Sequence, residues 1–288
     1  MQSDRVSQTA LKVALNLITL NQKGDWAERL PEGLAELSEK LILAAELPMY
    51  GPRIMAMSKQ RWMMSAYALG DLVMPGQFEG FGHRKCFVNE QVLAAIEVGI
   101  RQVVVLGAGF DTLALRLGTR FPKVQFFEVD HPSTSVAKRK GVAKLGQPDN
   151  VTLISADLTE AKLSKVILEE GRWNASAPAM LVAEGLFQYL RTDDVRGLLR
   201  EAAACTAPRS RFLFTHCLPD WSASLAGRIG RSLVRWVGEP FLSSVASKDL
   251  PEYIHGTGWQ IISDPDEDAR HGIERYAVAE RVPLTNVE

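Results

Sequence analysis

Apolar residues recur every three or four positions through the first third of the chain. The segments ALKVALNLITL, LAELSEKLILAAEL and IMAMSKQRWMMSAYALGDLVM all show this spacing, which is typical of amphipathic helices. Proline and glycine interrupt the pattern at Pro48, at Gly51 with Pro52, and at Pro75 with Gly76, as expected between helices. Residues 1–98 are therefore predicted to form a helical unit that caps the substrate side of the protein.

From residue 99 onward, short β-branched runs alternate with helical segments. The runs are QVVVLGAG, VQFFEVD, VTLISAD, AMLVAEGL and SRFLFTHC. Continuous apolar strands separated by helices predict an α/β fold in which a mostly parallel sheet is covered on both faces.

This alternation stops after Cys217. Residues 218–246 are predicted to form a helical insertion. The segments GWQIISD and ERYAVAERV follow it and are close enough in sequence to pair as a hairpin. Such a hairpin would add an antiparallel strand to the sheet, so residues 99–288 are expected to form one α/β core.

Composition excludes several classes of function. The chain has 33 basic and 34 acidic residues and a net charge of -1, which gives no basic field for nucleic acid or an anionic membrane. The three cysteines are scattered, so neither a metal site nor a disulfide framework is expected. No signal peptide or membrane span is predicted, and the expectation is a cytoplasmic monomer or homodimer. The basic run Lys138, Arg139 and Lys140 is assigned to a solvated helix face.

The stretch QVVVLGAGFDT is a predicted buried strand that breaks into a glycine loop. It lacks the Gly-Lys-Ser/Thr ending of a nucleoside triphosphate loop. Thr112 stands where the dinucleotide fingerprint has its third glycine. Asp130 ends the next strand about 20 residues further on, where a carboxylate can accept both ribose hydroxyls. Asp157 ends the strand after that, although both aspartates could instead cap the helices that follow.

Together these features resemble the class I S-adenosylmethionine-dependent methyltransferase fold. More closely, the chain is similar to the leucine carboxyl methyltransferase family and its bacterial polyketide O-methyltransferase relatives. The matching segments are HRKCFVNE, VVVLGAGFDTLALRL, FFEVDHP with a basic helix after it, SADL and LVAEGLFQYL. The resemblance implies a Rossmann-like fold with a seven-stranded, mostly parallel sheet and an antiparallel C-terminal strand. It also implies S-adenosylmethionine as the cofactor and no metal.

The resemblance assigns cofactor contacts residue by residue. Arg84 would bind the cofactor's carboxylate, because a planar guanidinium pairs bidentately with a carboxylate. Many family members have a second arginine and two aspartates where this chain has Cys86, Asn89 and Glu90. Asn89 cannot form an ion pair, so these positions do not predict a salt-bridge network behind the cofactor's tail. The remaining assignments are Gly107, Ala108 and Gly109 at the methionine part, Asp130 at the ribose with His131 beside the nucleoside, Asp157 and Leu158 at the adenine, and Glu184 at the amino group.

The acceptor side is predicted from apolar and aromatic residues near the expected crevice, each of which could equally belong to the core. Met74, Phe81, Trp236 and Phe241 are the candidate substrate contacts. His216 follows the fifth strand and is a candidate general base, or else a hydrogen-bonded structural histidine; Tyr189 is the second catalytic candidate. The wider set of predicted lining residues adds Met49, Tyr50, Phe78 and Trp221.

These features predict an S-adenosylmethionine-dependent O-methyltransferase that acts on a carboxyl or hydroxyl group of a small natural product. The acceptor is expected to be aromatic or polyketide-like. Methyl transfer from a sulfonium is an in-line displacement, to which the protein mainly contributes proximity and alignment. Three alternatives stay open: a methyltransferase for a protein C-terminal carboxyl, a binding protein without catalysis, and a nicotinamide-dependent oxidoreductase, which Thr112 disfavours.

Overall fold

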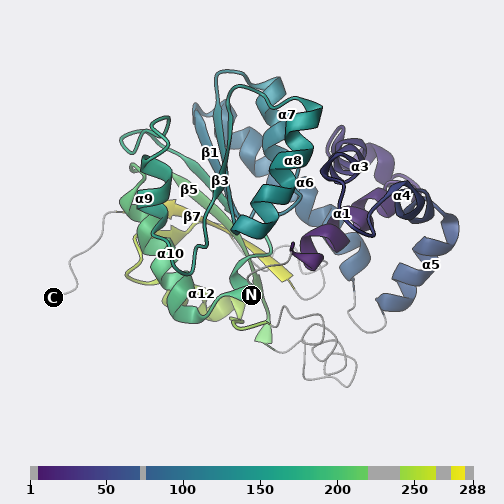
Figure 1. Ribbon diagram of the computed structural model, residues 1–288. Helices are drawn as coiled ribbons and strands as arrows, with labels where there is room; N and C mark the ends of the chain where they lie inside the picture. The colour runs from purple at the N-terminus through teal and green to yellow at the C-terminus, as the bar shows by residue number, and fades with distance from the viewer. Residues whose placement is uncertain (1–5, 72–75, 220–240, 264–273, 283–288) are drawn as a thin grey trace.

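A seven-stranded sheet forms the centre of the protein (Figure 1). The computed structural model describes residues 6–71, 76–219, 241–263 and 274–282. The strand order is β3-β2-β1-β4-β5-β7-β6. The strands are β1 (Gln102–Leu106), β2 (Gln125–Asp130), β3 (Val151–Ser155), β4 (Met180–Ala183), β5 (Arg211–Cys217), β6 (Trp259–Ile261) and β7 (Glu274–Arg281).

Strands β1 to β5 pair in parallel, and β7 pairs antiparallel with both β5 and β6. In the register of the centre, Val104 of β1 lies between Phe127 of β2 and Leu181 of β4. The hairpin predicted from the last two apolar runs is therefore present, and β7 is its inner strand. The predicted α/β Rossmann-like fold is confirmed.

Helices cover both faces of the sheet. Side chains alternate along each strand, so each strand places apolar residues on both faces. Val103 and Val105 of β1 pack among the N-terminal helices, whereas Val104 and Leu106 pack toward the opposite layer. Figure 1 shows the N-terminal helices on one side of the sheet and α9, α10 and α12 on the other. The helices are α1 (Gln8–Leu20), α2 (Trp26–Arg29), α3 (Leu34–Ala45), α4 (Pro52–Ser58), α5 (Arg61–Gly70), α6 (Gln77–Glu97), α7 (Leu113–Arg120), α8 (Pro132–Leu145), α9 (Leu163–Leu168), α10 (Thr192–Ala204) and α12 (Leu250–Ile254), with 3-10 turns η1 (Phe187–Tyr189) and η3 (Ser247–Asp249).

The N-terminal helices share one apolar core with the sheet. Leu11 of α1, Leu41 of α3 and Val88 of α6 belong to the same buried cluster as Val103. Helix α3 packs closely on α8, where a Cβ atom at Gly141 would lie 2.8 Å from the carbonyl oxygen of Leu41. Glycine at this position lets the two helix backbones approach, which fixes the N-terminal unit against the sheet.

One residue of the basic run on α8 is buried, which corrects the prediction of a solvated helix face for Lys138. Lys138 is 2% exposed, and its Nζ lies 2.5 Å from the Oε2 atom of Glu128 in β2. Burial raises the pKa of Glu128 to about 7, although the Lys138 ammonium opposes the shift. The other two residues of the run, Arg139 and Lys140, are exposed, and Lys140 has Glu46 at 2.8 Å. Because α8 lies between α3 and the sheet, a lysine pointing at β2 is buried with a strand carboxylate as its partner.

Most of the predicted insertion at 218–246 lies outside the described residues. Residues 241–246 are described and contain no regular helix or strand. Within the parts of the chain that the structure describes, no helix has both the length and the apolar character needed to cross a bilayer.

Candidate active site

The loop after β1 forms the floor of a cavity between the sheet and α1. Gly107 and Gly109 have φ angles of +66° and +51°, a region that residues with a side chain rarely adopt. A Cβ atom at Gly107 would lie 2.9 Å from Leu186, and one at Gly109 would lie 2.8 Å from the Cβ of Ala10. Both positions thus need glycine for conformation and for space.

We expect Gly109→Ala to destabilise the folded protein by about 1–3 kcal/mol, because it adds a methyl group to a filled space and strains the backbone. Urea unfolding of the variant measures the loss. The double variant Gly109→Ala, Ala10→Gly should recover only the packing part, since the positive φ remains. Full recovery in the double variant would show that the conformation of the loop contributes nothing.

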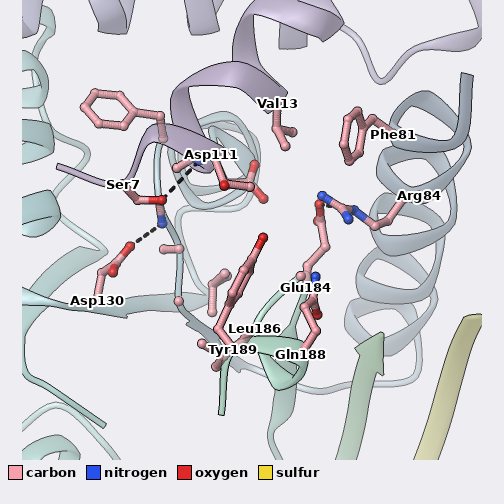
Figure 2. Close-up of a pocket in the computed structure, with 18 of the residues that line it drawn as sticks. Ser7, Val13, Phe81, Arg84, Asp111, Asp130, Glu184, Leu186, Gln188 and Tyr189 are labelled. Carbon is pink, nitrogen blue, oxygen red and sulfur yellow. Dashed lines mark hydrogen bonds and ion pairs between the residues drawn. The ribbon is translucent and has the colours of Figure 1, made fainter. Parts of the chain in front are cut away.

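Asp130 joins the end of β2 to the glycine loop. One oxygen of its carboxylate accepts a hydrogen bond from the backbone N–H of Gly109, and the other accepts from the N–H of His131 at 2.6 Å. Burial raises the pKa of Asp130, and these N–H groups oppose the shift. The structure places Asp130 in the cavity wall beside the loop, as Figure 2 shows. Its assignment to a ribose stays a prediction.

Arg84 faces the glycine loop from α6 and is held by two carboxylates. Its Nε donates to Glu184 Oε1 at 2.7 Å, and its Nη1 donates to Glu274. The Arg84 side chain is 5% exposed. Burial lowers the pKa of Arg84, but Glu274 and Glu184 raise it by more, so the guanidinium stays charged. Arg84 and Glu184, predicted from distant segments, are thus in direct contact (Figure 2).

Lys85 supplies a second buried cation that the sequence interpretation missed. Its Nζ lies 2.8 Å from Asp111 Oδ2 and 2.7 Å from Glu184 Oε1. Burial raises the pKa of Asp111, but the Lys85 ammonium lowers it by more and holds it well below its usual range. A salt-bridge network therefore exists although Asn89 cannot join it; Asn89 accepts a hydrogen bond from Arg116 instead, at 3.3 Å.

Three predicted nucleoside contacts do not belong to the cavity wall. His131 caps α8, with its Nδ1 2.9 Å from the hydroxyl of Ser133. Asp157 accepts from the N–H and hydroxyl of Thr159 and lies 3.6 Å from His131 Nε2. Leu158 packs partly buried against the core. All three follow β2 or β3, and their role at the adenine end remains a prediction.

Phe81, Tyr189 and Phe241 line the cavity, and Figure 2 shows Phe81 on the side away from Asp130. Tyr189 meets Phe241 edge to face at 5.5 Å between ring centroids. Other predicted lining residues lie elsewhere: Met49 is 86% exposed and Phe78 is buried in the core, and Tyr50 hydrogen-bonds to Gln8. Met74, Trp221 and Trp236 lie outside the described residues.

His216 is buried away from the cavity, contrary to the position expected of a general base. Its Nδ1 lies 3.0 Å from the carbonyl oxygen of Val245, and it does not line the cavity. The reason is strand alternation. Thr215 accepts a hydrogen bond from the N–H of Gly185 in the cavity wall, so the next side chain on β5 points to the other face. The hydrogen-bonded structural role is the one that this contact supports.

The cavity has a volume of about 150 Å³, below the 300–1,000 Å³ of typical ligand pockets. Ser7, the N-terminal cap of α1, and Ala10 and Val13 within α1 also line the cavity; Figure 2 shows Ser7 and Val13 at its upper side. The cavity wall carries a buried guanidinium beside buried carboxylates. These charged groups are complementary to an amino acid that has a free carboxylate and a free ammonium. Because the cavity is small, a nucleoside that carries an amino acid tail can bind only if side chains of the cavity wall move apart.

Comparison with known proteins agrees with this arrangement. The family model described as leucine carboxyl methyltransferase matches residues 35–203, more than half of the chain. The chain belongs to the leucine carboxyl methyltransferase family. This is a family of S-adenosylmethionine-dependent methyltransferases, so the resemblance stated from the sequence is confirmed and S-adenosylmethionine is the cofactor that membership implies.

Relatives of known sequence are named for the same cofactor. Two proteins of Mycolicibacterium paratuberculosis named as S-adenosyl-L-methionine-dependent methyltransferases are 30% identical over 204 residues and 31% identical over 217 residues. The first match covers 66% of this chain and 65% of the relative, and the second covers 70% and 67%. The chain thus spans about two thirds of the length of these relatives.

Solved structures with low sequence identity share the fold. A methyltransferase from Thermobifida fusca has a TM-score of 0.59 at 17% identity, covering 85% of this chain and 94% of that one. A protein of the duf574 family from Streptomyces avermitilis has a TM-score of 0.60 at 15% identity, with coverage of 88% and 98%. These likenesses concern the architecture alone.

Proposed function

We propose that the protein is an S-adenosylmethionine-dependent O-methyltransferase that acts on a carboxyl or hydroxyl group of a small natural product. The observation that carries this proposal is the contact of Arg84, Glu184 and Lys85 beside the positive-φ glycine loop. Such a wall suits a ligand that presents a carboxylate and an ammonium together. The family match at residues 35–203 supports the methyltransferase part of this proposal.

In this proposal Arg84 binds the cofactor's carboxylate, Glu184 faces its amino group, and Asp130 binds the ribose. Gly107, Ala108 and Gly109 lie against the methionine part, and the adenine contacts are those predicted at Asp157 and Leu158. When bound, S-adenosylmethionine supplies an activated methyl group for an in-line displacement. The chain's own contribution is to orient both reactants and exclude water.

The acceptor is proposed to lie against the aromatic side of the cavity, near Phe81, Tyr189 and Phe241. Rings at these positions favour an apolar or aromatic acceptor of the polyketide type. With His216 buried on the other face of β5, Tyr189 is the catalytic candidate that lines the cavity. A carboxyl acceptor has a pKa near about 4 and is already ionised at neutral pH, so it needs no base.

We expect the product to be a methyl ester and the turnover rate to be nearly flat from about pH 6 to 8, because a carboxylate stays ionised throughout this range. Purified protein, radiolabelled S-adenosylmethionine and a panel of aromatic acids and matched phenols would test this. Mild alkali should release labelled methanol from the product. An alkali-stable product whose rate rises with pH would show a hydroxyl acceptor instead.

A protein C-terminal carboxyl is the second candidate acceptor, and the description of the matching family favours it. The two candidates separate when a lysate is labelled with the radioactive cofactor and divided by molecular mass. Label in macromolecules would support the protein substrate, whereas label confined to small molecules would support the natural product.

A further inference from the structure

Glu274, the first residue of β7, contacts the Arg84 guanidinium in the candidate site. Glu274 accepts a hydrogen bond from Arg84 Nη1 and another from Gln188 Nε2 at 3.1 Å. The Glu274 side chain is 14% exposed and lies in the cavity wall. It comes from the antiparallel hairpin, outside residues 35–203 that match the family model. The motifs that predicted Arg84 and Glu184 therefore contain no sign of it.

Two carboxylates on two different nitrogens fix the plane of the Arg84 guanidinium. Glu184 binds Nε at 2.7 Å and Glu274 binds Nη1. A guanidinium has five N–H donors in a rigid fork; the described residues occupy two of them, so three, on Nη1 and Nη2, are available to a ligand. A group held at one nitrogen only could turn about that contact, whereas one held at both cannot.

Glu274 and Glu184 contribute differently to this arrangement. Glu184 is shared, because Lys85 Nζ lies 2.7 Å from Glu184 Oε1 and 2.8 Å from Oε2. Among the described residues, Arg84 is the one cation within 4.0 Å of the Glu274 carboxylate. Gln188 in turn holds the second oxygen of Glu274. Among the described cations, the carboxylate from β7 therefore pairs with Arg84 and is not shared as that of Glu184 is.

We propose that Glu274 is a positioning residue for Arg84 and fixes the guanidinium for the carboxylate of the cofactor's amino acid tail. This rests on the proposed assignment of Arg84 to that carboxylate. The consequence is specific to one part of the ligand. Substitution of Glu274 should weaken the binding of the cofactor's amino acid tail and leave the binding of its nucleoside part unchanged.

The test compares two ligands in the variant Glu274→Gln, which keeps the shape and removes the charge. S-Adenosylhomocysteine has the amino acid tail, and methylthioadenosine lacks it. By calorimetry, we expect the dissociation constant of S-adenosylhomocysteine to rise about tenfold, as for one charge-assisted hydrogen bond. The constant for methylthioadenosine should stay within about twofold. Glu280→Gln, on the same strand and away from Arg84, is the matched control and should change neither.

Combining Glu274→Gln with Arg84→Lys should add less than about twofold to the loss from Arg84→Lys alone, since the two residues would act through one contact. Equal weakening of both ligands by Glu274→Gln would show a merely structural role and overturn the proposal, as would unchanged S-adenosylhomocysteine affinity. Failure of the unaltered protein to bind S-adenosylhomocysteine at all would instead contradict the proposed function.

Discussion

Lys138→Met should lower the free energy of unfolding by about 3–5 kcal/mol at pH 8, because it leaves the Glu128 carboxylate buried without its cation. The loss should be smaller at pH 5.5. With Lys138 present the folded-state pKa of Glu128 is raised to about 7, and removal of the ammonium that opposes this shift raises it further. From about pH 4.5 up to its folded pKa the folded variant therefore binds more protons than the unfolded chain, and its stability falls as pH rises. Below the folded pKa, protonation removes the unpaired charge. Urea unfolding at both pH values measures the difference.

Lys140→Met is the matched control on the same helix. Lys140 pairs with Glu46 at 2.8 Å, but both side chains are more than half exposed, and such surface pairs contribute about 0–1 kcal/mol. Its loss should be small and equal at the two pH values. If Lys138→Met cost no more than Lys140→Met, or cost the same at pH 5.5 and 8, the buried ion pair would have no energetic role.

The strand segments along the chain and the glycine loop could be predicted because both leave a local signature. Apolar runs with β-branched residues mark strands, and Gly107 and Gly109 follow such a run directly. The resemblance added Arg84 and Glu184, which the structure brings within 2.7 Å. Glu184 directly follows β4, so its position follows from the rule that the carboxyl ends of parallel strands share one edge of the sheet, whereas Arg84 reaches the site from helix α6.

The partners of these residues left no such signature. Lys85 contacts Glu184 across 99 positions, and Arg84 contacts Glu274 across 190. Ion pairs at these separations follow from tertiary packing, which periodicity does not encode. For His216, the pattern predicted the strand but not which of its side chains point toward the site. The hydrogen bond from the Gly185 N–H to Thr215 shows that the Thr215 side of β5 faces the site.

The burial of Lys138 also depends on tertiary packing, although the sequence contained one signal of it. A basic run on a helix usually marks solvent, and Lys140 follows that rule. The acid inside the apolar run VQFFEVD was the available signal, because a carboxylate in a buried strand requires a partner. Glu128 and Lys138 are the pair that satisfies this requirement.

Arg84→Ala should weaken the binding of S-adenosylhomocysteine by at least about 100-fold. It removes hydrogen bonds between charged groups, worth about 1.5–3 kcal/mol, and leaves two buried carboxylates facing the ligand's own carboxylate. For the same reason, it should destabilise the fold by about 3–5 kcal/mol. Calorimetric titration therefore needs to be accompanied by thermal unfolding of the same sample.

Arg84→Lys separates the two effects, because it keeps the charge that Glu184 and Glu274 require but loses the planar fork. We expect this variant to recover most of the stability and to bind S-adenosylhomocysteine about tenfold more weakly than the unaltered protein. Methylthioadenosine, which has no carboxylate, should bind to it with unchanged affinity. Unchanged affinity of a folded Arg84→Lys protein for S-adenosylhomocysteine would mean that the guanidinium does not hold the cofactor's tail. In that case Lys85, whose ammonium also lies in the cavity wall, would be the next residue to test by substitution.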